Sequence, residues 1–514
     1  MIVFKKILSI ILVTTILTVA QDISWFNPSG DTFHISTEAH LQGLAQLVNS
    51  EISDFSEKTI ILIDDITLTG NHTPIGNNLT NTRRFLGIFD GNSKAISNLS
   101  ISSGNWNYAG LFGYVGTNGQ IKNLTVNVSK INVGNYAGGL AAFYASIKPI
   151  ENCGVNIEYG IHSPSILSGS ITYYLGGLIG YGDGAITITN SYTTGNVSDA
   201  IESLILSSSN SCYSGGLIGY VNGTIEIINS YTTGNVSSSA RPYYGNYHTY
   251  SYSGGLVGNA SATIAISNSY STGNITSAGR GGSGGLVGHG IGSISNSYTM
   301  GNVYNLSDND YSGGLVGIGG GVITNCYAGG IISGGFSGGI FGEKISGTST
   351  SVYYNSAGAS SASGKGSSVG MIALGSEQLK NSGNFIGWDF ENIWGIDPEA
   401  NDGFPHLRWA FPRDTTTSIY NVRKSNNFCG IRFAQNIVSD RAEINVVLPN
   451  NEGVADARIV VYDMAGNAVF VGSPVVLGFE KPKRSISCKW YIFSRCRSEE
   501  RKRQNTRIFR EIRD

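Results

Sequence analysis

The stretch YSGGLIGYVNGTIEIINSYTTGNVS, from Tyr213 to Ser237, returns along the chain with few changes. Near-copies begin at Tyr174 and at Tyr252. The glycine that precedes the apolar residue of each copy can be followed through eight positions: Gly110, Gly139, Gly177, Gly216, Gly255, Gly285, Gly314 and Gly339. The steps between these positions fall in the range typical of proteins built from stacked repeats, in which one unit cannot bury its apolar face alone.

Each full copy contains three short runs that are apolar or alternating, and none has the 3.6-residue period of a helix. In the copy around Gly216 these runs are GLIGY, TIEIINSY and GNVS. The pattern predicts an all-β fold: a parallel β-helix (β-solenoid) of about eight coils, with three strands in each coil and about 4.8 Å between coils. We expect the glycine pairs to allow turns with positive φ.

Stacking of equivalent residues explains why only 13% of the residues are charged, because like charges directly above one another repel. An asparagine column is predicted at one corner: Asn190, Asn229, Asn268, Asn296 and Asn325. A tyrosine column accompanies it: Tyr192, Tyr231, Tyr270, Tyr298 and Tyr327. We interpret both columns as structural ladders. Cys153 and Cys326 replace the serine of other copies, and we expect them to be buried in the same stack.

The charge of the chain is unevenly distributed. The segment from Lys481 onward carries 12 basic and 4 acidic residues, and without it and the first 20 residues the net charge is about −12. The body of the protein is therefore predicted not to bind nucleic acid. Residues 1–20, with Lys5 and Lys6 before an apolar run, predict a cleaved signal peptide, and we expect no transmembrane span in the mature chain.

Two copies carry insertions between the GNV strand and the next glycine pair, at residues 199–212 and 238–251. Insertions at one corner project from one face of a solenoid, which is commonly the face that meets partners. The second insertion contains four clustered tyrosines, which we take as a candidate partner-contact loop: Tyr243, Tyr244, Tyr247 and Tyr250. The alternative is that these rings pack on the flank of the solenoid.

The repeat resembles the GLUG motif, a short repeat of secreted and surface bacterial proteins, many of them described as adhesins. The flanking segments 35–50, 73–101 and 387–409 also resemble those of such arrays. The resemblance implies a β-solenoid on or outside the cell and supplies no catalytic residues. Within the first flank, residues 38–49 have a helical apolar stripe after Thr37 as N-cap, which predicts a short helix capping the first coil.

The composition changes after Trp409. The alternating stretch Ala442–Phe470, with DMAGN as a hairpin turn, resembles the small Ig-like modules found at the C-termini of secreted proteins. The later strands of such a module are missing, and we hypothesise a shifted reading frame near Gly478; a genuine basic tail is the alternative. The predicted segments are 1–20 signal peptide, 21–105 N-terminal cap, 106–345 repeat solenoid, 346–410 exit segment, 411–430 linker, 431–478 partial Ig-like module and 479–514 basic tail.

Signals for an enzyme are weak. Asp308 and Asp310 are the only carboxylates close together in the repeats, and Ser283 of GGSGG repeats a serine found in other copies. No cysteine spacing suits zinc. We therefore predict no catalytic residue, cofactor or metal, and a function in adhesion to an extracellular glycan or protein. The alternatives are a carbohydrate-active β-helix enzyme (a polysaccharide lyase or hydrolase) and an inert spacer.

Overall fold

The computed structural model describes residues 21–411, except 78–81, 103–106, 133, 163–171, 199–200, 203–210, 242–249 and 308, and seven strands beyond residue 411. The chain divides into two compact units, Met1–Leu407 and Arg408–Asp514. The first unit is all-β apart from short helices, and it contains a very large sheet of parallel strands.

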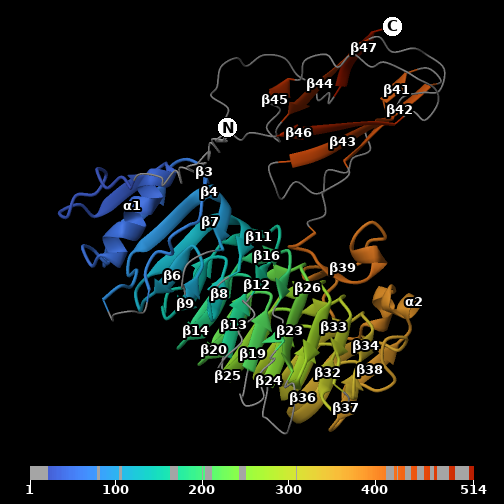
Figure 1. The fold of residues 1–514 in the computed structure, drawn as a ribbon. Helices are drawn as coiled ribbons and strands as arrows, with labels where there is room; N and C mark the ends of the chain where they lie inside the picture. Colours follow the sequence, from blue (N-terminus) through green and yellow to red (C-terminus); the bar gives the residue numbers. More distant parts are fainter. Residues whose placement is uncertain are drawn as a thin grey trace, which may run out of the picture. The chain divides into compact units, whose positions relative to one another are not determined.

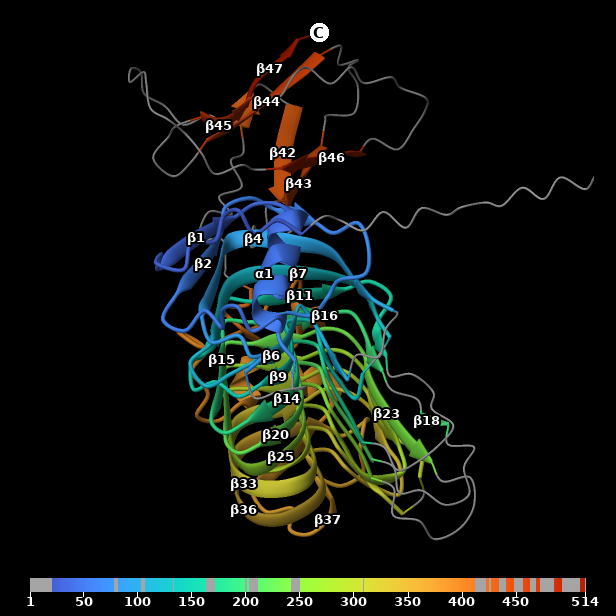
Figure 2. The same ribbon diagram turned by 60° about the vertical axis from the view of Figure 1, so that its left-hand side comes forward.

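The strands of the first unit stack coil upon coil, with equivalent residues of successive repeats in register (Figures 1 and 2). Ile179 pairs with Ile218, for example, and Ile218 pairs with Val257. The repeat around Gly216 has five strands: β19 (Ser211–Gly215), β20 (Ile218–Asn222), β21 (Ile225–Ile228), β22 (Tyr231–Thr232) and β23 (Val236–Arg241). The prediction of three strands is wrong, because the run TIEIINSY is divided at Asn229 into β21 and β22, and a further strand, β19, precedes the run GLIGY.

Five columns of strands result from this stacking. The first forms its own sheet: β5 (Tyr108–Ala109), β8 (Tyr136–Gly138), β13 (Thr172–Gly176), β19, β24 (Tyr250–Gly254), β28 (Arg280–Gly284), β32 (Tyr311–Gly313) and β35 (Phe336–Gly338). The second contains β6 (Phe112–Val115), β9 (Ala141–Tyr144), β14 (Ile179–Asp183) and β20, and continues in the long strands β25 (Val257–Ser267), β29 (Val287–Ser295), β33 (Val316–Ala328) and β36 (Phe341–Asn355).

The same long strands extend into the third column, and β33 and β36 extend into the fourth as well. The third column contains β7 (Gln120–Ile131), β10 (Ile150–Glu151), β15 (Ile186–Thr189) and β21; the fourth contains β11 (Gly154–Ile157), β16 (Tyr192–Thr194), β22, β26 (Tyr270–Ser271) and β30 (Tyr298–Thr299). The fifth contains β12 (Ile161–His162), β17 (Val197–Ser198), β23, β27 (Ile275–Ala278), β31 (Val303–Asn305) and β34 (Ile332–Ser333), and β18 (Ile201–Glu202) also pairs with β23.

The glycine pairs serve close packing between coils, and they do not have positive φ as the sequence led us to expect. A Cβ atom on Gly216 would lie 2.1 Å from the carbonyl oxygen of Gly255 in the next coil. Positive φ occurs instead at the corner asparagines, with 48° at both Asn190 and Asn229. Asparagine tolerates this left-handed conformation better than most residues, which explains why it recurs at the corner.

The N-terminal end of the stack is covered by the predicted helix, α1 (Glu38–Asn49), as Figure 1 shows. The Thr37 side chain accepts a hydrogen bond of 3.1 Å from the backbone N–H of His40 and so caps the helix as predicted. Leu41, Leu44 and Leu47 are buried in the same core as the strands. The accompanying strands are β1 (Thr32–Ile35), β2 (Thr59–Leu62), β3 (Ile66–Thr67) and β4 (Ile88–Ile101).

The interior of the stack is a continuous apolar core of aliphatic residues from successive coils. Cys153 and Cys326 are fully buried free thiols, as predicted, and burial raises the pKa of each to about 12. Between them, at the same corner, lies a column of buried serines whose hydroxyls accept from the neighbouring coil's backbone: Ser191, Ser230, Ser269 and Ser297. The buried hydroxyls of this serine column are therefore all hydrogen-bonded.

The exit segment contains β37 (Ser363–Lys365), β38 (Met371–Leu374), α2 (Ser376–Leu379), η1 (Ser382–Asn384), β39 (Trp394–Gly395), η2 (Asn401–Gly403) and β40 (His406–Leu407). β37 and β38 add to the edge of β36. After β38 the chain turns onto the side of the last coils, where Trp388 stacks on Trp394 with 4.2 Å between the ring centroids.

The second unit consists of antiparallel strands. One sheet contains β41 (Val422–Lys424), β42 (Asn427–Phe433), β43 (Arg441–Val447) and β46 (Ser485–Tyr491), and the other contains β44 (Asp456–Tyr462), β45 (Ala468–Val471) and β47 (Phe509–Arg513). β44 and β45 pair across the predicted hairpin, whose turn lies outside the described residues. The basic segment after residue 478 contributes β46 and β47 to these sheets.

Candidate ligand-binding surface

The asparagines predicted to form a ladder occupy equivalent corner positions of successive coils. Asn229 Nδ2 donates a hydrogen bond of 3.2 Å to Asn190 Oδ1. Asn325 Nδ2 lies 3.4 Å from Asn296 Oδ1 in the same relation. Asn268, between these pairs, has the same left-handed backbone, with φ of 49°. Amide hydrogen bonds thus join two pairs of the column, Asn190 with Asn229 and Asn296 with Asn325.

The five tyrosines predicted to accompany them stack face to face. Successive ring centroids are 4.9–5.2 Å apart, and the ring planes are 2–11° from parallel. The C-terminal part of this column is covered by the exit segment, because the Tyr327 hydroxyl donates to the Pro405 carbonyl at 2.6 Å and Trp394 packs on Tyr298. Tyr298 and Tyr327 are fully buried, so this end of the column is closed to a ligand.

Of the four tyrosines of the candidate contact loop, Tyr243, Tyr244 and Tyr247 lie outside the described residues. Tyr250 begins β24 and is 40% exposed. Its ring lies 6.3 Å from that of Tyr252, nearly parallel to it. The second insertion therefore leads directly into a surface strand with two aromatic side chains on one face.

Tyr252 belongs to a second tyrosine column, which the sequence analysis did not identify. Its rings stack along the first column of strands with centroids 4.7–5.8 Å apart: Tyr108, Tyr136, Tyr174, Tyr213 and Tyr252. A parallel column stands on the second column of strands, with centroids 4.5–5.2 Å apart: Tyr114, Phe143, Tyr181 and Tyr220. We call these nine rings the aromatic surface.

The two columns of the aromatic surface contact each other edge to face in a herringbone arrangement. The rings of Tyr174 and Tyr181 are 5.0 Å apart with planes at 89°, and those of Tyr213 and Tyr220 are 5.1 Å apart at 61°. Such offset and edge-on geometries are the favourable ones for aromatic pairs. The surface is therefore rigid, and most of its rings are half-buried.

Partial burial also governs the chemistry of the hydroxyl groups. It raises the pKa of Tyr181 and of Tyr252 to about 12, with neighbouring acidic and phenolic groups adding to the effect. The phenols are thus neutral near pH 7 and can both donate and accept hydrogen bonds. Because the hydroxyl is the part of a tyrosine farthest from the backbone, outward-facing tyrosines place polar groups over an apolar ring layer.

Charged groups lie mainly at the two ends of the aromatic surface. The Arg84 guanidinium stands 4.6 Å from the centre of the Tyr114 ring at one end. At the other end, in the last coils, Lys365 Nζ and Glu343 Oε1 form an ion pair of 2.6 Å. The strands that carry the nine rings contain one charged residue, Asp183, which accepts a hydrogen bond from Asn222 Nδ2. Directly beyond the last ring, Arg280 of β28 is in register with Tyr250, and Asp310 lies close enough to help raise the pKa of Tyr252.

The sequence did contain the signal for this surface. The copies at Tyr174 and Tyr213 read Y-x-G-G-L-x-G-Y, with one aromatic residue before the glycine pair and another after the third glycine, as in Tyr213 and Tyr220. Variants of this pattern at Tyr108 and Tyr136 also carry two aromatic residues. Tyr213 and Tyr220 are seven positions apart, and in a single strand they would point to opposite faces. The turn at Leu217 between β19 and β20 brings both rings to the outer side.

The residues considered for catalysis have structural contacts. Ser283 is buried, donates to the Tyr304 carbonyl at 2.9 Å and is in register with Ser253 and Ser312. Asp310 is buried and accepts from the Gly281 N–H, and its pKa is raised chiefly by burial; Asp308 lies outside the described residues. In the described part of the chain, no three His, Cys, Asp or Glu side chains are grouped so that they could hold a metal ion.

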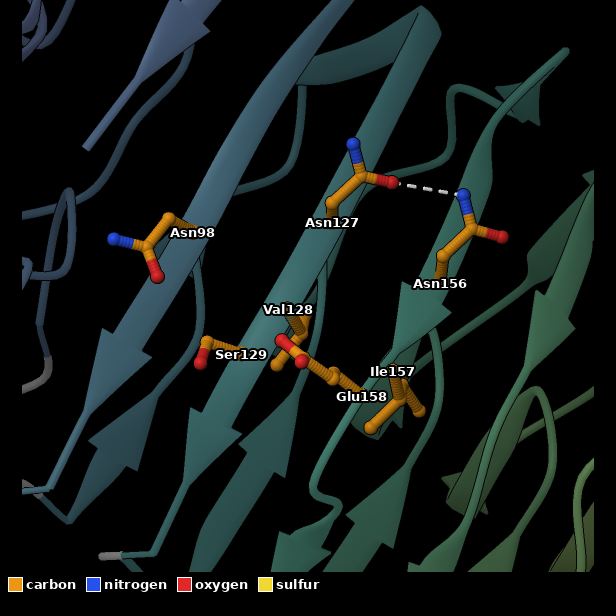
Figure 3. Close-up of a pocket in the computed structure, with 7 residues that line it drawn as sticks. All are labelled: Asn98, Asn127, Val128, Ser129, Asn156, Ile157 and Glu158. Atoms are coloured by element: carbon orange, nitrogen blue, oxygen red, sulfur yellow. Dashed lines mark hydrogen bonds between the residues drawn. The ribbon is translucent and has the colours of Figure 1, made fainter.

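A hollow of about 260 Å³ lies over β4, β7 and β11 and is shown in Figure 3. It is lined by Asn98, Asn127, Val128, Ser129, Asn156, Ile157 and Glu158. The amide of Asn156 donates to Asn127 at 2.8 Å, and that of Asn98 donates to the Leu68 carbonyl. These amides are thus hydrogen-bonded to neighbouring coils. We therefore take the aromatic surface, and not this hollow, as the main candidate for ligand binding.

Comparisons with known proteins give limited matches. No family model matches the chain. A stretch of 106 residues, 19% of the chain, is 33% identical to Halomucin of Haloquadratum walsbyi and spans only 1% of that protein. A crystal structure from Bacteroides ovatus, described as a putative immunoglobulin A1 protease, has 18% identity and a TM-score of 0.40, with 74% of this chain and 92% of that chain covered. Within the described residues, no helix has the length and apolar character needed to span a membrane.

Proposed function

We propose that this chain is an exported GLUG-repeat protein, secreted or held at the cell surface, that functions in adhesion rather than catalysis. In this proposal the stacked parallel strands form a β-helix of about eight coils, and the aromatic surface with its adjoining insertion engages an extracellular glycan or protein. The proposal revises the predicted contact site, because none of the nine rings of the aromatic surface belongs to the insertion at residues 238–251, although Tyr252 directly follows it in the sequence.

The observation that carries the proposal is the herringbone of nine rings on the outside of the stack. A solenoid needs apolar side chains in its interior, and the core here is supplied by aliphatic residues. Two outward columns of half-buried aromatic rings are a large amphipathic surface, of the kind enriched where proteins meet partners. The export signal predicted at residues 1–20, outside the described residues, agrees with an extracellular ligand.

The test is a binding screen of the chain against a glycan array and a panel of extracellular-matrix proteins. A variant with Tyr213→Ser and Tyr220→Ser removes two rings from the centre of the aromatic surface, and we expect it to lose most of the binding. Tyr231→Ser, in the other tyrosine column, is the matched control and should bind as the parent does. Equal binding by all three proteins would refute the assignment of the surface.

A second variant separates the loop from the surface. Ser238 Oγ lies 2.6 Å from both Ser251 Oγ and Ser253 Oγ in the interior, so a deletion that removes Ser238 or Ser251 would damage the stack. Deleting only residues 242–249 avoids this damage. If that deletion abolishes binding while the Tyr213→Ser, Tyr220→Ser variant still binds, the insertion is the contact site and the aromatic surface has only a structural role.

A further inference from the structure

The aromatic surface repeats at a fixed distance along the stack. Its rings recur once per coil, and the five-ring column extends over five successive coils at centroid spacings of 4.7–5.8 Å. A ligand that makes the same contact with each coil must therefore repeat at about the same distance. An extended peptide advances about 3.3 Å per residue, with side chains on alternate faces, and so does not match this spacing. An extended chain of β-linked pyranose sugars advances by about one coil spacing per sugar.

The chemistry of the surface also suits sugars. Each tyrosine supplies an apolar ring and a hydroxyl that both donates and accepts hydrogen bonds. Pyranose rings have the complementary pattern, since C–H groups and hydroxyls alternate around the ring. The neutral state of Tyr181 and Tyr252 keeps both hydrogen-bonding roles available at neutral pH.

The charge distribution selects among sugar polymers. The Arg84 guanidinium stands at one end of the surface. At the other end Arg280 is in register with Tyr250 and interacts with the Asp310 carboxylate, and the Glu343–Lys365 ion pair follows in the last coils. Asp183 is the one charged residue on the described strands that carry the nine rings. A polyanion laid along the rings would lose hydration without gaining a counter-charge at each coil, and Asp183 would repel it. A neutral polymer incurs neither cost.

We therefore propose that the aromatic surface binds an uncharged linear polysaccharide with its axis parallel to the stack, so that successive sugars contact successive coils. This inference rests on the proposed adhesive function and specifies its ligand. Because the longer column has five rings, affinity should rise with each added sugar up to about five and change little for longer oligomers. Binding at one isolated coil would give no such dependence on length.

The experiment uses the full chain and isothermal titration calorimetry with neutral cello-, xylo-, manno- and N-acetylchito-oligosaccharides of two to eight sugars. Oligomannuronate, which is β-1,4-linked like the neutral series, is the charged probe. We expect at least one neutral series to bind, with affinity reaching a plateau near five sugars, and the charged probe to bind at least tenfold more weakly. A Tyr174→Phe, Tyr213→Phe variant keeps the stacked rings and removes two hydroxyls, and it should weaken binding about tenfold or more, since each net hydrogen bond changes affinity severalfold.

Tyr231→Phe is the matched control, because it removes a hydroxyl from the other tyrosine column, and it should bind with unchanged affinity. Failure of all four neutral series, tighter binding of oligomannuronate, or affinity independent of length would overturn the inference. The proposed function would survive any of these results if the chain bound a matrix protein and lost that binding in the Tyr213→Ser, Tyr220→Ser variant. The proposed function and the inference would both be refuted only if the chain bound no glycan and no matrix protein through the aromatic surface.

Discussion

The left-handed corner asparagine gives the most direct test of how the coils are built. At Asn229 the backbone φ is 48°, and Nδ2 donates to Asn190 Oδ1 at 3.2 Å. An ordinary L-residue in this conformation costs about 1–2 kcal/mol. Losing one part-exposed hydrogen bond costs about 0.5–1 kcal/mol. Asn229→Ala should therefore lower the free energy of unfolding by about 2 kcal/mol.

Asn229→Gly removes the same hydrogen bond but adopts the left-handed backbone without strain. Its cost should be about 1 kcal/mol, made up of the lost bond and the greater freedom of glycine in the unfolded chain. Alanine should thus be worse than glycine by about 1 kcal/mol. At Asn235, which lies outside the left-handed region and accepts from the Asn274 N–H at 2.9 Å, the order should reverse, because glycine offers no conformational gain there.

Urea denaturation followed by far-ultraviolet circular dichroism gives the four free energies, provided that the m-value stays that of the parent. The reasoning is refuted if Asn229→Ala and Asn229→Gly are equally stable, or if alanine is the better residue at both positions. Either outcome would mean that the corner is held by side-chain hydrogen bonds alone, and that the left-handed backbone is not what selects asparagine.

Three further predictions concern packing, pH and thiol chemistry. Gly255→Ala places a Cβ 2.0 Å from the Gly285 carbonyl oxygen and should destabilise the protein by about 3 kcal/mol in urea denaturation, whereas Gly70→Ala, with open space around it, should change little. Burial raises the pKa of Tyr181, Tyr252, Cys153 and Cys326 to about 12, so these groups ionise first in the unfolded chain. Stability should therefore fall as the pH rises from about 9 to 12, and thermal melts that are flat across this interval would contradict this. The Cys326 thiol, buried with a pKa near 12, should not react with a thiol reagent until the protein unfolds, and rapid labelling of the native protein at this site would disprove its burial.

Much of the fold could be predicted from local patterns. The apolar stripe after Thr37 predicted α1 together with its cap, and the recurrence of one phrase predicted stacked parallel strands. The strand count was wrong because the pattern does not show that Asn229 reverses its φ and ends a strand. The positive φ predicted for the glycine pairs was wrong as well. Glycine can be required either for an unusual backbone conformation or for close packing, and the sequence does not distinguish the two. The contact between Gly216 and the Gly255 carbonyl of the next coil shows that close packing is the reason here.

The candidate site was less predictable than the fold. The tyrosines of the repeat were noticed at the asparagine corner, where Tyr298 and Tyr327 are covered by the exit segment. The exit-segment residues that cover these tyrosines lie about 80 or more positions later in the chain, and no local sequence pattern predicts this contact. The aromatic surface needed the turn at Leu217, which puts Tyr213 and Tyr220 on the same side of the coil.

The sequence by itself determined that equivalent residues lie one above another, because a repeated phrase with fixed spacing can bury its apolar positions only against its own copies. The tertiary structure decided which of the resulting columns are accessible. Exposure depends on where the coil turns and on which distant segment packs against its side, and both arise from contacts between residues far apart in the chain.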